Sequence, residues 1–407
     1  MPVWKRNMYI LMVSQFLVLG SMTMIMPFLP LYLKELGMTD PKQVQLWAGL
    51  IFGINFLSQI IVQPIWGNLA DRYGRKMMIL RSGFGMAIAT FLMGLATSHW
   101  QLFILRLLNG VVSGFIPASI SLMATNSPKE KSGYVLGMLQ AGATAGSIIG
   151  PFMGGVLAEL VGYRNNFIVT SMLLLTAALV VLFAVKEEKK PDPSVQPKNS
   201  LLQDGMFVLN QRTLLLLYGV GLLLQFANVG PTPLMSLFVD ELGAHGHVAF
   251  FAGLVTAMTG ISNLLSSPIL GRAADRYGSE RVLFIALIAS GLLFIPHMIV
   301  NSIWQLLFLR FLLGLCVGGL LPSLNSLIRR HSPPGKESTA YGFYTSANSI
   351  GNLLGPICYG AMSGWFGIRG VFPVTGLILI LNAFWFKAAL RKKVQGQHSR
   401  NTAKTSA

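Results

Sequence analysis

Stretches of about 20 apolar residues recur along almost the whole chain, and short polar or charged segments separate them. A helix of that length crosses a hydrocarbon layer of roughly 30 Å. Runs this long, without alternation of apolar and polar residues, indicate helices rather than the strands of a barrel. The pattern predicts an all-α polytopic membrane protein with twelve transmembrane helices, at residues 9–33, 46–67, 79–97, 100–124, 133–157, 165–185, 213–238, 248–270, 281–300, 303–328, 338–362 and 370–390.

The two halves of the chain resemble each other. The segment GNLADRYGRK at 67–76 returns as GRAADRYGSE at 271–280, and WQLFILRLLNG at 100–110 returns as WQLLFLRFLLG at 304–314, both 204 residues later. Such a repeat predicts two parallel six-helix halves with a substrate site between them. The expected organisation is an N-terminal half at 1–185, a central loop at 186–212, a C-terminal half at 213–391 and a basic tail at 392–407.

Composition and charge agree with a membrane protein. The chain is 53% hydrophobic and only 11% charged, against about a quarter charged in soluble domains. The net charge of +17 could indicate a nucleic-acid partner, but most of the 31 Lys and Arg residues fall on the side that holds both termini. This bias places both termini and the central loop in the cytoplasm. Anionic lipid beside this face accounts for the charge without nucleic acid.

The central loop begins with charged and proline-rich sequence. Its second part places Leu201, Leu202, Met206 and Leu209 at helical spacing. This part is either a short helix on the membrane surface or a plain solvated linker.

Four motifs, in order and on the appropriate helices, resemble those of the major facilitator superfamily. The loop at 67–76 is similar to the family's G-x-x-x-D-R-x-G-R-R/K loop, and LFILRLLNGVVSG at 102–114 to its arginine motif on helix 4. GSIIGPFMGG at 146–155 resembles the antiporter motif of helix 5, and LGSMTMIMPFLP at 19–30 the helix 1 signature of twelve-helix drug:proton antiporters. The resemblance covers essentially the whole chain.

The resemblance implies a secondary transporter of a bacterial inner membrane. It would export small amphipathic drugs by alternating access, driven by inward proton flow, as a monomer without a cofactor or metal. The alternative is a transporter of one physiological solute, such as a sugar or an organic anion. A membrane enzyme is disfavoured, because the only close group of His, Asp and Glu is at 240–247, in an outer loop. The chain also lacks the G-x-x-x-x-G-K-S/T loop that binds ATP.

The first charged turn combines a helix cap with a basic surface. Gly74 permits positive φ and Asp71 can cap a helix, while Arg72, Arg75 and Lys76 are expected on the inner surface. The resemblance implies that Asp71 holds the two halves together at the N-terminus of helix 11 and releases them when the protein opens inward. For Arg75 and Lys76, the alternative is a basic loop that only sets orientation.

Arg106 lies within a predicted span, where a charged side chain costs at least about 2.5–3.5 kcal/mol and marks function. It is predicted to be a positive element of the substrate cavity that favours neutral or anionic molecules. The alternative is that its guanidinium snorkels to the interface near Trp100. Arg310 occupies the same place in the second half.

Helix 5 and scattered polar groups complete the candidate sites. The helix 5 residues predict close helix packing, and the resemblance adds a seal on the outer side: Gly146, Gly150, Pro151, Gly154 and Gly155. About half of the candidate cavity residues are expected to bond between helices instead. These candidates are Gln15, Asn55, Gln59, Asn109, Gln140, Gln225, Asn228, Asn325, Tyr344 and Asn348.

The proton carrier is not evident, because no Asp or Glu falls within a predicted span. The remaining candidates are Asp71 on the inner side and the acids Glu35 and Glu159 on the outer side.

Overall fold

The structure is a computed structural model that describes residues 1–187, 211–244, 246–333 and 337–405. These residues form helices joined by short turns, and no strand occurs among them. The first half contains α1 (Val3–Met24), η1 (Met26–Phe28), α2 (Leu29–Glu35), α3 (Pro41–Tyr73), α4 (Arg75–Gly94), α5 (His99–Val112), α6 (Phe115–Asn126), η2 (Lys129–Lys131) and α7 (Ser132–Ala184). The second half contains α9 (Arg212–Val229), η3 (Thr232–Leu234), α10 (Met235–Glu241), α11 (Val248–Tyr277), α12 (Ser279–Phe294), η4 (Ile295–Ile299), α13 (Ile303–Val317), α14 (Leu320–His331) and α15 (Glu337–Thr405).

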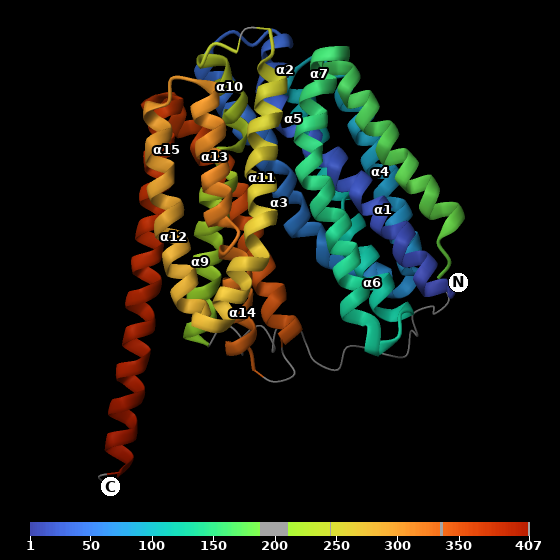
Figure 1. Ribbon diagram of the computed structural model, residues 1–407. Coiled ribbons are helices and arrows are strands. Elements are labelled where there is room, and N and C mark those ends of the chain that lie inside the picture. The colour runs from blue at the N-terminus through green and yellow to red at the C-terminus, as the bar shows by residue number, and fades with distance from the viewer. Residues whose placement is uncertain (188–210, 245, 334–336, 406–407) are drawn as a thin grey trace.

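The prediction of an all-α protein with twelve membrane crossings is confirmed. Ten helical segments of the described chain are long and apolar enough to cross a membrane, and two of them contain two predicted spans each. These two, α7 and α15, turn back at Gly162 (φ 82°) and Gly367 (φ 70°), where glycine adopts a left-handed backbone without strain. Figure 1 shows α7 rising to the top of the bundle and returning. The last helix continues past the predicted span end as far as Thr405.

Several spans that the sequence predicts as single helices are broken. The first span consists of α1, η1 and α2, and its kink contains Pro27. The seventh span has the same construction at Pro233, which is the matching residue of the repeat. Proline lacks the N–H that continues a helix, so a short 3₁₀ turn takes its place. The fourth span breaks between α5 and α6 at Gly114, whose φ is 130°.

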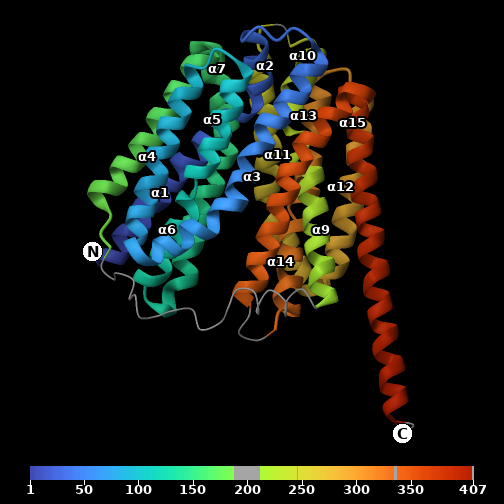
Figure 2. The same ribbon diagram turned by 180° about the vertical axis from the view of Figure 1, so that it is seen from behind.

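The two halves contact each other at the end of the bundle that carries α2 and α10, called here the α2–α10 end. The most extensive contacts pair α3 with α15 and α7 with α11, and α2 also contacts α10. Gly49 faces the carbonyl of Pro356 in the first pair, and Gly155 faces that of Ala249 in the second, so closely that a Cβ would clash with either carbonyl. At the opposite end, α6 and α14 stand apart in both views (Figures 1 and 2).

The buried core follows the same division. One cluster joins residues of both halves near the α2–α10 end, including Phe28 and Tyr32 with Phe238 and Phe372. A second cluster, around Leu122, lies within the N-terminal half alone. The closed end is therefore stabilised by a shared core, whereas this second core lends no stability to the contact between halves.

Candidate functional site

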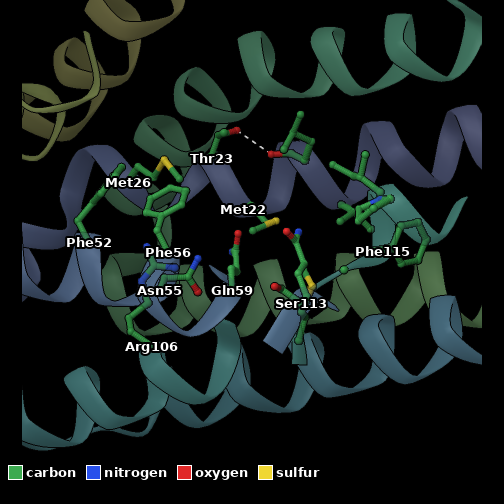
Figure 3. Close-up of a pocket in the computed structure, with 17 residues that line it drawn as sticks. Met22, Thr23, Met26, Phe52, Asn55, Phe56, Gln59, Arg106, Ser113 and Phe115 are labelled. Carbon is green, nitrogen blue, oxygen red and sulfur yellow. Dashed lines mark hydrogen bonds between the residues drawn. The ribbon is translucent and has the colours of Figure 1, made fainter. Parts of the chain in front are cut away.

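A cavity of about 260 Å³ lies inside the N-terminal half (Figure 3). Helix α3 contributes Phe52, Asn55, Phe56, Gln59 and Gln63, which recur every three or four residues and therefore share one face of the helix. Helix α1, η1 and α4 add Met22, Thr23, Met26 and Met86. Methionine and phenylalanine adapt to varied apolar shapes, and the amides provide a few polar contacts.

Arg106, on α5, is the charged side chain that lines this cavity. It is only 5% exposed, so it does not snorkel to the membrane interface. Its Nε has no hydrogen-bond partner, and no carboxylate lies within ion-pair distance among the described residues. Figure 3 places Arg106 beside Asn55 and Gln59, with no acidic residue in the lining. The cavity therefore offers an uncompensated positive charge.

The break between α5 and α6 opens into the same cavity. Ser113, Gly114 and Phe115 line it, so the N-terminus of α6 lies at the cavity wall. Arg81 donates from Nη2 to the Ser113 carbonyl at 3.0 Å. Its guanidinium stacks on Trp66, 3.4 Å from the ring centroid, and Trp66 Nε1 donates to the Val111 carbonyl at 2.7 Å. These bonds satisfy carbonyls that the break frees, and the positive end of α6 adds to the charge of Arg106.

A second cavity, of about 620 Å³, lies between α7 and the C-terminal half. Arg310 lines it from α13, and α11 contributes Thr256, Thr259, Asn263 and Ser267. Arg310 also lies 5.8 Å from the ring centroids of Phe294 and Phe372, and its Nε and Nη2 have no hydrogen-bond partner in the described chain. This cavity also contains one cation without an acid, but hydroxyls and amides surround it.

The two cavities occupy equivalent positions of the duplicated halves. Adding 204 to the α3 residues of the first cavity gives the α11 residues of the second: Phe52 becomes Thr256, Phe56 becomes Gly260 and Gln59 becomes Asn263. Arg106 becomes Arg310 by the same step. The repeat has kept the arginine and replaced the two phenylalanines by the smaller Thr256 and Gly260. The second lining is thus richer in hydroxyl and amide groups than the first, although apolar side chains line both cavities.

The candidate cavity residues divide between lining and packing. Asn55 and Gln59 line the first cavity, and Asn228 lines the second. The remaining seven line neither of these two cavities: Gln15, Asn109, Gln140, Gln225, Asn325, Tyr344 and Asn348.

Two of these seven contact neighbouring helices instead of a cavity. Asn109 donates to Thr90 Oγ1 at 3.5 Å, and Tyr344 packs against Gly221 between α9 and α15. Gln63 and Arg310 are lining residues absent from the candidate set. Gln63 could have been found because it lies one helical turn beyond Gln59, and Arg310 because it is the repeat equivalent of Arg106.

The first charged turn is bound to its own half. Gly74 takes φ 95°, and the Glu187 carboxylate accepts from the backbone N–H groups of Arg75 and Lys76 at 2.9 and 3.1 Å. Lys76 Nζ donates to the Leu182 carbonyl at 2.8 Å. Arg75 donates to Thr125 Oγ1. The two basic residues are therefore held by protein atoms of α6 and the α7 end.

Arg72 and Asp71 belong to the same charged turn, at the end of α3. Arg72 lies exposed in the last turn of α3. The side chain of Asp71 lies outside the described part of the chain, as does the region 188–210 that contains the expected surface helix or linker.

The fifth predicted span, which is the first part of α7, packs against two different neighbours. Gly146, Gly150 and Gly154 face the backbone or side chains of α1 so closely that a Cβ would clash. Gly155 and the carbonyl of Pro151 face α11 of the other half, where Pro151 opposes Gly253. The motif thus packs α7 against α1 within the N-terminal half and against α11 of the C-terminal half.

Comparisons with known proteins agree with this architecture. The sequence profile described as Major Facilitator Superfamily matches residues 11–252 and again 217–406. The chain is 40% identical over 397 residues to multidrug resistance protein MdtG of Escherichia fergusonii, with 97% of each chain covered. It is likewise 40% identical over 393 residues to the protein of that name from Dickeya zeae, with 96% of each covered.

Solved structures share the fold at low sequence identity. A bacterial homologue of the human lysosomal transporter Spinster, inward-facing and occupied, superposes with a TM-score of 0.82 at 17% identity, over 96% of this chain and 97% of that one. A mutant of the nucleoside transporter NupG gives 0.78 at 16% identity, over 95% and 99%. The profile match to both halves, together with the extended identity to MdtG proteins, shows that this multi-pass membrane protein belongs to the major facilitator superfamily.

Proposed function

We propose that this protein is a secondary multidrug exporter of the bacterial inner membrane, which moves amphipathic molecules outward in exchange for protons. The observation that carries the proposal is the pair of equivalent cavities, one lined by Met and Phe side chains around Arg106 and one richer in hydroxyls and amides around Arg310. An amphipathic molecule has one part that suits each lining. Promiscuous binding suits a cavity of Met and Phe with few fixed polar contacts.

The charge of the cavities sets the substrate preference. Neither lining contains a carboxylate, and each contains one arginine. The uncompensated positive charge would repel a cationic drug, whereas it would attract an anionic one and would not repel a neutral one. The protein is therefore expected to export neutral and anionic amphiphiles better than cationic ones.

The way the halves meet supports transport by alternating access. They share a core at the α2–α10 end, and α6 and α14 stand apart at the other (Figure 2). The positive-inside bias supports a cytoplasmic position for that other end, so we interpret the structure as an inward-open state. Similarity to inward-facing Spinster-homologue structures supports this assignment. Export then requires the α2–α10 end to open to the outside.

Proton exchange is supported by the motifs of drug:proton antiporters at 19–30 and 146–155. The acids that can take part lie at the ends of the bundle: Asp71 on the inner side, and Glu35 and Glu159 at the α2–α10 end. Glu35 lies 3.8 Å from Arg164 of its own half, and Glu159 contacts the other half.

A panel of matched amphiphiles tests the substrate class. Cells lacking their own drug exporters would produce either the wild type or Arg106→Gln, and growth inhibition would be measured with neutral, anionic and cationic compounds of similar size. The wild type is expected to protect against the neutral and anionic compounds, and Arg106→Gln to weaken protection against the anionic ones. Protection against cationic compounds alone would contradict the proposal.

The second candidate is a transporter of one physiological solute. The polar lining of the second cavity favours it, because several hydroxyls and amides converging on one arginine could select a sugar or an organic anion. Uptake or counterflow of single labelled solutes in liposomes separates the two. Saturable transport of one solute, without protection against any drug, would favour this candidate.

A further inference from the structure

The start of α11 has no cap from its own chain segment. His247 stands at its N-cap position without a side-chain capping bond. The matching helix of the first half, α3, is capped by Asp40, whose carboxylate accepts from the Lys42 N–H at 3.0 Å. Unpaired N–H groups in the first turn of a helix require a partner.

That partner comes from the opposite half of the protein. Glu159 of α7 accepts from the Phe250 N–H at 2.8 Å through Oε1, and its Oε2 lies 3.0 Å from His247 Nδ1. Phe250 is the third residue of α11, whose N–H is the usual target of a capping side chain. The carboxylate also faces the positive end of the helix. The Glu159 side chain is 21% exposed, so water competes only partly for its bond to the Phe250 N–H, whereas His247 is 68% exposed and its contact contributes little.

Glu159 stands at the end of a close helix contact. One turn before it, Gly155 packs against the Ala249 carbonyl, and Pro151 opposes Gly253 one turn earlier. Separation of α7 from α11 at the α2–α10 end must therefore break the Glu159 bonds.

The repeat provides no equivalent tie on the other face of the interface. The position 205 residues after Glu159 is Gly364, which lies near Lys42 at the start of α3. Glycine has no side-chain group to donate or accept there, and α3 already has Asp40 as a cap. The two faces of the interface thus differ, with a charged tie between α7 and α11 and glycine packing between α3 and α15.

Other ion pairs at this end hold the halves less firmly. Lys34 and Asp240 join α2 to α10 at 2.8 Å, but their side chains are 43% and 40% exposed, and exposed pairs contribute little. Glu35 with Arg164 and Glu241 with Arg369 each remain within one half.

We propose that Glu159 is the outer latch of this transporter, a gating residue that closes the α2–α10 end by capping α11 of the opposite half. Opening to the outside leaves the first turn of α11 without its cap and exposes the carboxylate to water. The latch rests on the proposed function in one respect, namely that this end opens during the cycle. Its residues are Glu159, His247 and Phe250.

Distance measurements between spin labels test the latch without any transport assay. Labels would be placed at Thr97→Cys and Asn301→Cys, exposed positions in the loops before α5 and α13. Both loops lie at the α2–α10 end, because Tyr32 contacts Ala96 and Arg369 contacts Val300 there. The free cysteines Cys316 and Cys358 would first be changed to serine. Double electron–electron resonance in nanodiscs then gives the populations of closed and open forms.

The latch predicts a graded response. Glu159→Ala is expected to raise the ratio of open to closed forms about tenfold, since a hydrogen bond to a charged group is lost. Glu159→Gln keeps an acceptor for the Phe250 N–H but loses the charge, and a smaller rise is expected. Glu241→Ala is the matched control, because it removes an acid at the same end whose ion pair, with Arg369, remains within one half.

The outcomes separate the latch from the proposed function. An unchanged distance distribution in both Glu159 variants, or an equal shift in Glu241→Ala, would overturn the latch. If the distributions shift as expected but no drug moves in liposomes, the latch stands and the proposed export fails. Protein yield and elution volume of the Gln variant show whether the comparison concerns folded protein.

Discussion

Replacement of Arg106 by methionine should make the protein more stable and less active at the same time. The guanidinium is 5% exposed, and no carboxylate compensates it in the described chain. An arginine at the centre of a span costs about 2.5–3.5 kcal/mol, and replacing buried charges by apolar groups of similar size often stabilises by about 1–4 kcal/mol. Because the cavity side of Arg106 can be hydrated, a gain of about 1–3 kcal/mol is expected.

Thermal unfolding in detergent and drug protection in cells would be measured on the same variant. Arg164→Met is the matched control, since Arg164 is 46% exposed and only 3.8 Å from Glu35 at the bundle end. Its stability should stay within about 0.5 kcal/mol of the wild type. If Arg106→Met destabilises the protein, Arg106 is a structural residue. If Arg106→Met exports anionic drugs normally, the guanidinium does not face the substrate.

Three further predictions address the packing and the inner side. Gly146→Val should lose about 1–3 kcal/mol of stability, because a side chain there meets the Phe16 carbonyl of α1; Gly137→Val, with no atom within 4 Å of its Cβ, should change it far less in the same thermal assay. Glu187→Ala should lower the unfolding temperature by the equivalent of about 1 kcal/mol, since it removes the cap of α4, and Glu187→Gln should restore part of the loss. Asp71→Asn should slow export sharply while Asp275→Asn does less, as an efflux assay would show. Equal tolerance of both would contradict a switching role for Asp71.

The periodicity of the sequence predicts most of the fold. The twelve apolar runs are local features of the sequence, and the repeat at 204 residues is found by comparing the chain with itself. Neither requires knowledge of how the helices pack. The chain reversals at Gly162 and Gly367 fall between predicted spans for the same reason. The sequence does not predict the break at Gly114, because the fourth run stays apolar across it. The structure reveals the break by the backbone of Gly114 and by the bonds of Arg81 and Trp66 to the freed carbonyls.

The candidate sites were predictable only in part. Arg106 stands out because a charge within a span is costly, and the repeat could have added Arg310 and the polar face of α11. Amides such as Asn109 and Gln140 cannot be assigned from sequence, because helix rotation decides whether they face a cavity or a neighbour. Contacts between halves, such as Glu159 with Phe250, join residues far apart in the chain and depend on how two rigid units meet.

The most direct test of the account is drug movement in liposomes under an imposed pH gradient. The purified protein would be reconstituted with a defined orientation, and a fluorescent anionic or neutral amphiphile would be added on the side of the chain termini. Acidifying the side of the α2–α10 end should accelerate its movement toward that side, and collapsing the gradient with a protonophore should remove the acceleration. If the rate is the same with and without the gradient, the claim of proton-driven export is wrong.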